Sequence, residues 1–123
     1  MAEESQFTEG IRSRPLRSAE RKVIEAMVAG KCDKREVDKL TACRVEDMQD
    51  GGMGSIRFVN PDQQKRRFGK PLVEAEYVDG DGVMVGIAYN LDEKGELYEL
   101  DFWKVDFSAL QRYPEPSELR LKA

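Results

Sequence analysis

The chain has 123 residues, and 24 Asp and Glu against 20 Lys and Arg give it a net charge of −4 at pH 7. A chain of this length forms one domain that buries roughly two thirds of its unfolded surface. The net charge disfavours nucleic acids and anionic membranes as partners. No apolar run approaches the roughly 18 residues needed to cross a bilayer, and the N-terminus has no apolar signal core. We therefore expect a cytoplasmic protein with no membrane association.

The chain contains no histidine, which excludes Ser-His and Cys-His nucleophile pairs and His-ligated zinc. Its two cysteines, Cys32 and Cys43, fit neither a disulfide framework nor a CxxC motif, so we interpret them as reduced thiols. A catalyst would have to use carboxylates, Lys, Tyr or a hard metal ion. We predict no cofactor and no metal, and the composition favours a protein that is not an enzyme.

The first third of the chain predicts an arm followed by helix. Residues 1–14 are polar without a sustained period, which is typical of a disordered or extended arm. From Ala19 to Ala29 the apolar residues recur at helical spacing, and Ser18 is the expected N-cap. The spacing of acidic residues predicts a second, short helix from Lys34 to about Leu40.

Two short strands are predicted next, at Cys43–Met48 and Ser55–Val59. The glycine-rich stretch Asp50–Ser55 between them resembles a phosphate loop, but it leads into a strand and not into a helix, so a hairpin turn is favoured over an anion-binding nest. The basic stretch Lys65–Lys70 is interpreted as a solvated loop in preference to a nucleic-acid contact, because no second basic stripe accompanies it.

The segment Pro71–Phe107 predicts three consecutive antiparallel strands. A three-residue turn at Gly80–Gly82, with Gly82 left-handed, places Tyr77 opposite Val85. A loop at Asp92–Gly95 places Tyr89 opposite Tyr98, Ile87 opposite Leu100 and Val85 opposite Phe102. One apolar face results, which the first helix covers, and it consists of Val73, Ala75, Tyr77, Val83, Val85, Ile87, Tyr89, Tyr98, Leu100 and Phe102.

These elements predict an α+β fold in which an N-terminal helix or helix pair packs on one face of an antiparallel meander of about five strands. The expected single domain covers residues 15–110, and residues 111–123 form a C-terminal tail. The free edge of the last strand is a candidate surface for a homodimer.

The opposite face of the meander is predicted to be acidic. The same register places Glu74 and Glu99 on either side of Ala88, and Glu76 and Asp101 on either side of Gly86. Four carboxylates then flank a furrow that Met84 and Trp103 close at one end.

Three interpretations of this face remain open. It is a solvated surface, with Arg57 pairing with Glu74 or Glu76. It is a recognition face for a basic protein partner, anchored by Trp103. Or it is a carboxylate or hard-metal site, although carboxylates two strands apart are separated by roughly 10 Å at the backbone, which is wide for coordination.

The stretches DGGMGSIRF, DGDGV and LYELDFWKVDFSAL resemble a family of small uncharacterised bacterial proteins with DGGMGS and LYELDxWKxDFS signatures. The resemblance covers Arg14 to Leu110 and implies a bacterial origin and a compact domain, but no activity. Small acidic bacterial domains include immunity proteins, which bind and neutralise a toxin. We therefore interpret the chain as a protein-binding, immunity-like module. The candidate partner-binding residues are Glu74, Glu76, Met84, Glu99, Asp101 and Trp103. The alternative is a small enzyme or a metal- or ligand-binding protein that uses the furrow.

Overall fold

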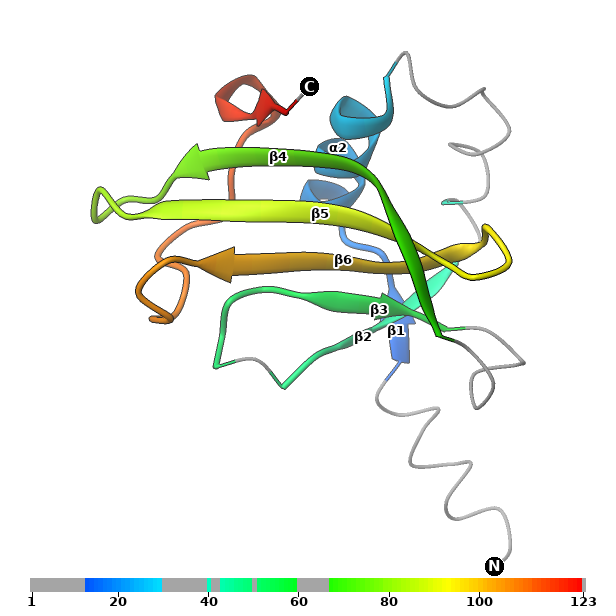
Figure 1. The fold of residues 1–123 in the computed structure, drawn as a ribbon. Helices are drawn as coiled ribbons and strands as arrows, with labels where there is room; N and C mark the ends of the chain where they lie inside the picture. The colour runs from blue at the N-terminus through cyan, green and yellow to red at the C-terminus, as the bar shows by residue number, and fades with distance from the viewer. Residues whose placement is uncertain (1–12, 30–39, 41–42, 50, 60–66, 123) are drawn as a thin grey trace, which may run out of the picture.

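The computed structural model describes residues 13–29, 40, 43–49, 51–59 and 67–122. Within these ranges the chain forms one antiparallel sheet of seven strands in the order β1-β2-β3-β6-β5-β4-β7, with one α-helix, α2, on one face (Figure 1). The elements are β1 (Ser13–Pro15), α2 (Ser18–Val28), β2 (Arg44–Asp47), β3 (Ile56–Phe58), β4 (Phe68–Val78), β5 (Met84–Asp92), β6 (Leu97–Lys104), the 3-10 helix η3 (Pro116–Glu118) and β7 (Arg120–Leu121).

The α+β class and the antiparallel sheet are confirmed, whereas the expected number of about five strands is too low. The two additional strands, β1 and β7, form the edges of the sheet and contain three and two residues. Strands of two or three residues are too short to show the alternation of apolar and polar residues from which a strand is predicted. The predicted second helix lies outside the described residues, except for its last residue, Leu40.

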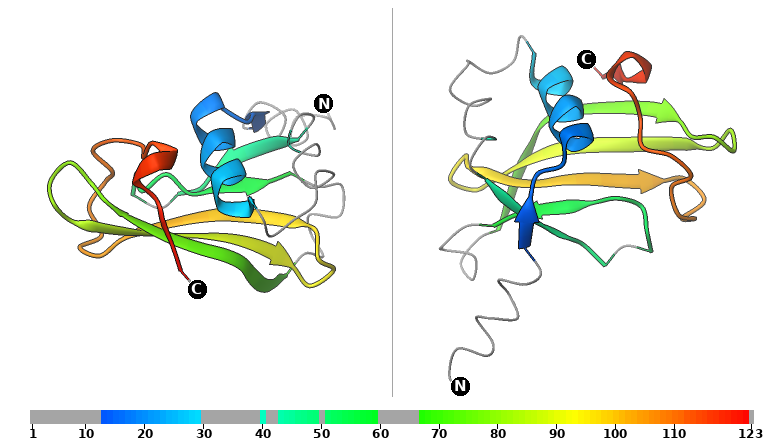
Figure 2. Two further views of the ribbon diagram at one scale, coloured as in Figure 1. Left: turned by 90° about the horizontal axis from the view of Figure 1, so that it is seen from above. Right: turned by 180° about the vertical axis from the view of Figure 1, so that it is seen from behind.

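Helix α2 covers one face of the sheet, as predicted (Figure 2). Its apolar stripe is fully or almost fully buried against the strands and consists of Val23, Ile24, Met27 and Val28. The prediction that Ser18 caps this helix is wrong, because Ser18 is its first residue and Arg17 is the N-cap. The backbone N–H of Arg17 donates to Glu20 Oε1 at 2.8 Å, so a side chain from the first turn satisfies this terminus.

An ion-pair network attaches β1 to the helix and to β2. The guanidinium of Arg14 donates to both carboxylate oxygens of Glu20, at 2.9 and 2.7 Å. The same group donates to both oxygens of Asp47, at 3.2 and 2.8 Å. Glu20 is only 3% exposed, so its charge depends on Arg14 for compensation.

The hairpin of β4 and β5 has the predicted register. Tyr77 lies opposite Val85, and Ala75 lies opposite Ile87. The backbone N–H of Asp79 donates to Val83 O at 2.9 Å, which closes a turn of three residues between them. The last turn residue, Gly82, has a φ of 82°, the left-handed conformation that glycine adopts without strain.

The predicted register between β5 and β6 is wrong by two residues. Tyr89 lies opposite Leu100, Ile87 opposite Phe102 and Val85 opposite Lys104. One residue of the shift comes from the turn, which contains three residues and not four, because the N–H of Asp92 donates to Glu96 O at 2.9 Å.

The other residue of the shift comes from a β-bulge. Asn90 pairs with Glu99 while Leu91 pairs with Leu97, so Tyr98 is the extra, bulged residue of β6. Because two single-residue shifts add to an even number, the β6 side chains that follow the bulge, from Glu99 onward, stay on their predicted faces. Leu97 precedes the bulge, lies opposite Leu91 and packs against the core. The prediction that Tyr98 belongs to the buried apolar face is wrong. Its side chain is half-buried, and the Arg57 guanidinium lies 5.2 Å from its ring centroid.

The core lies between α2 and the inner face of the sheet. The strand residues that build it are Val45, Ile56, Phe58, Val73, Ala75, Tyr77, Val85, Ile87, Tyr89, Leu100 and Phe102, none more than 4% exposed. Strand β6 lies between β3 and β5, so the prediction that the last strand of the meander has a free edge is wrong.

Candidate functional site

The sheet face opposite α2, called here the outer face, carries all six residues predicted to bind a partner. The observed register arranges it in rows across β6, β5 and β4: Asp101–Ala88–Glu74, then Trp103–Gly86–Glu76. The next row is Val105–Met84–Val78, because Met84 lies opposite Val78 and Met84 O accepts the N–H of Val105 at 3.0 Å. The predicted rows, with Glu99 beside Ala88 and Asp101 beside Gly86, are wrong by one row.

Trp103 therefore occupies the place that the predicted furrow would take. A Cβ built on Gly86 would lie 2.4 Å from both Cε2 and Cζ2 of Trp103, so the indole lies directly on the glycine backbone. The indole ring of Trp103 therefore covers the strand backbone that was expected to form the floor of the furrow between Glu76 and Asp101. Among the described residues no three His, Cys, Asp or Glu side chains are grouped closely enough to hold a metal ion.

Two of the four predicted carboxylates are held by neighbouring strands. Glu99 accepts hydrogen bonds from Arg57 Nη2 at 3.3 Å and from Asn90 Nδ2 at 3.1 Å. Asp101 accepts a hydrogen bond from Ser55 Oγ at 3.1 Å. The predicted pairing of Arg57 with Glu74 or Glu76 is wrong, because β3 lies beside β6 and not beside β4.

The other two carboxylates lie on β4, next to the edge strand β7. Glu76 pairs with Arg120 Nη2 at 3.2 Å. Glu74 makes no ion pair with any other described residue, although its backbone oxygen accepts the N–H of Lys122 at 2.9 Å. Glu74 is thus the carboxylate of the outer face that is most available to a partner.

The third row of the outer face is apolar and exposed. Val78, Met84 and Val105, called here the apolar row, are 45%, 38% and 60% exposed. The row crosses three neighbouring strands and lies beside Trp103, which is half-buried. Exposed apolar surface that is continuous over several strands marks a contact surface far more often than scattered single residues do.

A buried charged cluster below this end of the sheet was not predicted from the sequence. Lys104 is completely buried, and its Nζ contacts Asp79 Oδ2 at 2.9 Å, Asp81 Oδ2 at 2.5 Å and Ala109 O at 3.1 Å. The alternation of β6 places residue 104 on the inner face after Leu100 and Phe102, and a lysine there requires a buried acid. That alternation was the signal that could have found it.

Asp79 connects the cluster to the C-terminal segment. Its carboxylate accepts the backbone N–H groups of Gly80, Gln111 and Arg112 at 2.7, 2.8 and 3.1 Å, in addition to the Lys104 contact. Burial alone would raise the pKa of Asp79, but these hydrogen bonds outweigh it and lower the pKa to about 2. Burial would likewise lower the pKa of Lys104, whereas its bonds to Asp81 and Asp79 raise it.

The glycine-rich loop packs against the same C-terminal segment. The carbonyl of Gly52 accepts the N–H of Leu110 at 3.1 Å, and a Cβ on Gly52 would lie 3.1 Å from the Cβ of Ala109. Gly52 and Gly54 have φ values of 83° and 97°. The glycines thus serve a tight turn and a close approach to Leu110, as expected for the favoured hairpin interpretation.

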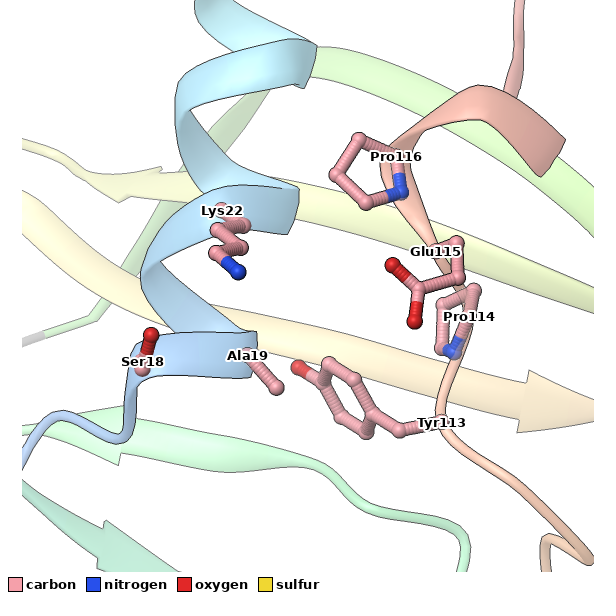
Figure 3. Close-up of a pocket in the computed structure, with 7 residues that line it drawn as sticks. All are labelled: Ser18, Ala19, Lys22, Tyr113, Pro114, Glu115 and Pro116. Carbon is pink, nitrogen blue, oxygen red and sulfur yellow. The ribbon is translucent and has the colours of Figure 1, made fainter.

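A pocket of about 300 Å³ lies apart from the outer face, between α2 and the segment that precedes η3 (Figure 3). The Lys22 and Glu115 side chains extend into it from opposite sides, and Tyr113 lies at its base. The Tyr113 hydroxyl is buried and forms no hydrogen bond with any other described residue, and burial raises its pKa. The full lining consists of Ser18, Ala19, Lys22, Tyr113, Pro114, Glu115 and Pro116, none of them predicted as a site residue.

Comparison with known proteins identifies a family that the chain matches. A family model described as a domain of unknown function, DUF6984, matches residues 13–114. The chain belongs to this family. The part of the DUF6984 domain matched here includes the outer-face strands, the Lys104 cluster and the turn after β6.

Neither the curated proteins nor the solved structures contain a match. Of the helices in the described part of the chain, none is long and apolar enough to span a membrane.

Proposed function

We propose that this member of the DUF6984 family is a non-enzymatic module that binds another protein through its outer face. The observation that carries the proposal is the apolar row, in which Val78, Met84 and Val105 stay 38–60% exposed beside the half-buried Trp103. Protein interfaces are enriched in aromatic residues and Met at their centre, with polar residues at the rim. The outer face contains both an apolar centre with an aromatic residue and a polar rim within its three rows.

The charges of the outer face define the partner that fits it. Glu74 has no ion pair with the described residues, and Glu76 is compensated by Arg120 only from one side. A partner with a basic surface would gain complementary charge at this rim, which accelerates encounter and selects the orientation. In its most specific form the proposal is a bacterial, cytoplasmic, immunity-like protein that neutralises a basic partner.

The alternative of an enzyme or metal site in the carboxylate furrow loses its geometric basis. The indole of Trp103 lies on Gly86, where the floor of the furrow was expected. Glu99 and Asp101 are engaged by Arg57 and Ser55, which leaves no pair of free carboxylates among the described residues of this face directed at one reacting atom. We therefore retain protein binding as the conclusion.

The test is an affinity capture from the native host with three purified baits: wild type, Glu74→Lys and Met84→Ala. Glu74 and Met84 are chosen because neither side chain stabilises the fold through an ion pair with a described residue or through deep burial. We expect the wild type to retain a specific protein and each variant to retain at least tenfold less.

Matched controls lie elsewhere on the surface. Glu93→Lys makes the same charge reversal in an exposed turn, and Val59→Ala removes a comparable apolar group, 43% exposed, after β3. Both controls should retain as much as the wild type. Equal retention by all five baits, or none by the wild type, would remove the outer face as the binding surface.

A further inference from the structure

The turn after β6 holds an exposed aromatic residue in an unusual backbone conformation. Phe107 is 77% exposed, the highest value among the large apolar side chains of the described residues. Its φ is 62°, and it is the one residue other than glycine with positive φ among them. Non-glycine residues rarely adopt this region, and an aromatic side chain there is strained. Folding alone gains nothing from placing a phenyl ring in water at a strained position.

The turn is fixed at both ends. At its start the N–H of Phe107 donates to Lys104 O at 2.8 Å, and Lys104 is the buried residue held by Asp79 and Asp81. At its end Lys104 Nζ reaches Ala109 O at 3.1 Å.

The Asp106 carboxylate stabilises the turn by hydrogen bonds within it. Asp106 Oδ1 accepts both the N–H and the hydroxyl of Ser108, at 3.0 and 2.6 Å. The next residue but one, Leu110, is tied to Gly52 O. The segment from Val105 to Ser108 therefore has its backbone defined before any partner arrives. An aromatic residue presented in this way loses little conformational entropy on binding, which is the property of an interface anchor.

We propose that Phe107 is the anchor of the interaction assigned to the outer face, and that it enters an apolar recess rimmed by basic groups on the protein partner. This inference rests on the proposed function. Phe107 comes two residues after Val105 of the apolar row, which places the anchor at the same end of the sheet.

The basic groups expected on the partner follow from the charges that surround the Phe107 turn. Asp79, Asp81 and Asp106 supply three carboxylates against the ammonium of Lys104. Arg112 and Glu118 pair with each other and add no net charge, so these six groups sum to −2. Lysine and arginine on the partner would meet that charge. In this arrangement Lys104 acts as a positioning residue, because it fixes the turn that carries Phe107 without lying at the surface itself.

The first experiment places the photoreactive residue p-benzoylphenylalanine at position 107, at position 84 or, as a control, at position 93, and irradiates cells of the native host. We expect one protein to be crosslinked from positions 107 and 84 and none from 93. Crosslinking from 84 alone would overturn the anchor and leave the proposed function standing. No crosslink from either would overturn both, and a crosslink to a second copy of the chain would overturn the hetero-partner.

The second experiment measures the affinity of the crosslinked protein, once purified, for variants of the turn. Phe107→Ala should raise the Kd by about 30-fold or more, as loss of an anchor does. Phe107→Asn should weaken binding equally while the midpoint of thermal unfolding stays equal or rises, because Asn tolerates positive φ. Lys104→Met should raise the Kd and also lower the unfolding midpoint. A Kd for Phe107→Ala within about threefold of the wild type would refute the anchor.

Discussion

The indole of Trp103 lies on the backbone of Gly86, at a distance that leaves no space for a Cβ at position 86. This contact connects β6 and β5 on the outer face and explains how Gly86 stays buried on a side of the sheet that no described helix covers. A glycine in a central strand usually weakens it, so its presence here indicates a close approach by another group.

Substitution of Gly86 by Ala should displace the indole. We expect a loss of about 1–3 kcal/mol in the free energy of unfolding, as for overpacking in a close-packed site. Because the chain has a single tryptophan, the emission maximum reports this residue alone and should shift to longer wavelength. Gly80→Ala is the matched control: its Cβ would lie 3.2 Å from the flexible amide oxygen of Gln111 and at ordinary contact distances, 3.7 and 4.0 Å, from Gln111 Cβ and Arg112 Cδ. An unshifted spectrum with unchanged stability would contradict the contact.

Loss of the Asp79 charge should be costly. Asp79→Asn leaves the buried Lys104 with Asp81 as its one carboxylate partner among the described residues, and we expect a loss of about 3 kcal/mol in the free energy of unfolding, typical of breaking a buried ion pair. Urea denaturation monitored by circular dichroism measures it. Glu25→Gln, which removes the exposed pair with Arg21, should change the midpoint little. A comparable effect from both variants would argue against the buried network.

The Asp79 carboxylate should also make the free energy of unfolding depend on pH. The pKa of Asp79 is about 2 in the folded protein, below the ordinary value of 3.8, so its contribution is present above about pH 4 and is lost as the pH falls towards 2. The corresponding loss is about 2 kcal/mol. Urea midpoints measured from about pH 6 to pH 2 should decline less steeply in Asp79→Asn than in the wild type. Parallel profiles for the two proteins would mean that other carboxylates carry the acid response.

The Arg14 network should require a guanidinium specifically. Arg14→Lys retains the charge but cannot donate paired hydrogen bonds to both Glu20 and Asp47, so we expect a loss of about 1–2 kcal/mol. Arg21→Lys, at an exposed helix position paired with Glu25, provides the comparison. Hydrogen exchange of α2 should accelerate in Arg14→Lys and not in Arg21→Lys. Equal exchange would show that β1 is attached by its backbone alone.

Much of the fold was predictable because the alternation of apolar residues encodes faces directly. The inner face of the meander and the Gly80–Gly82 turn are determined by residues such as Tyr77, Val85 and Gly82, and the structure agrees. The row alignment of the second hairpin was not predictable from alternation. A shift of two residues leaves every face unchanged, so the pattern contains no information about it.

The candidate site was predictable in its residues and not in its arrangement. All six predicted residues lie on the outer face, but the three-residue turn and the Tyr98 bulge together move Trp103 onto Gly86 and bring Asp101 opposite Ala88. Lys104 was missed because a lysine is normally assumed to be solvated. Phe107 was missed because positive φ at a non-glycine residue leaves no trace in composition.

The short edges of the sheet have a consequence for the behaviour of the protein at high concentration. In the described part of the chain, β1 and β7 offer three and two residues on which a foreign strand could add, which is a short template for a growing aggregate. Strand β7 also covers the backbone of Ala75 and Glu76 on the eleven-residue strand β4. A chain truncated before Arg120 would uncover this backbone, and light scattering should detect faster polymerisation than in the untruncated chain.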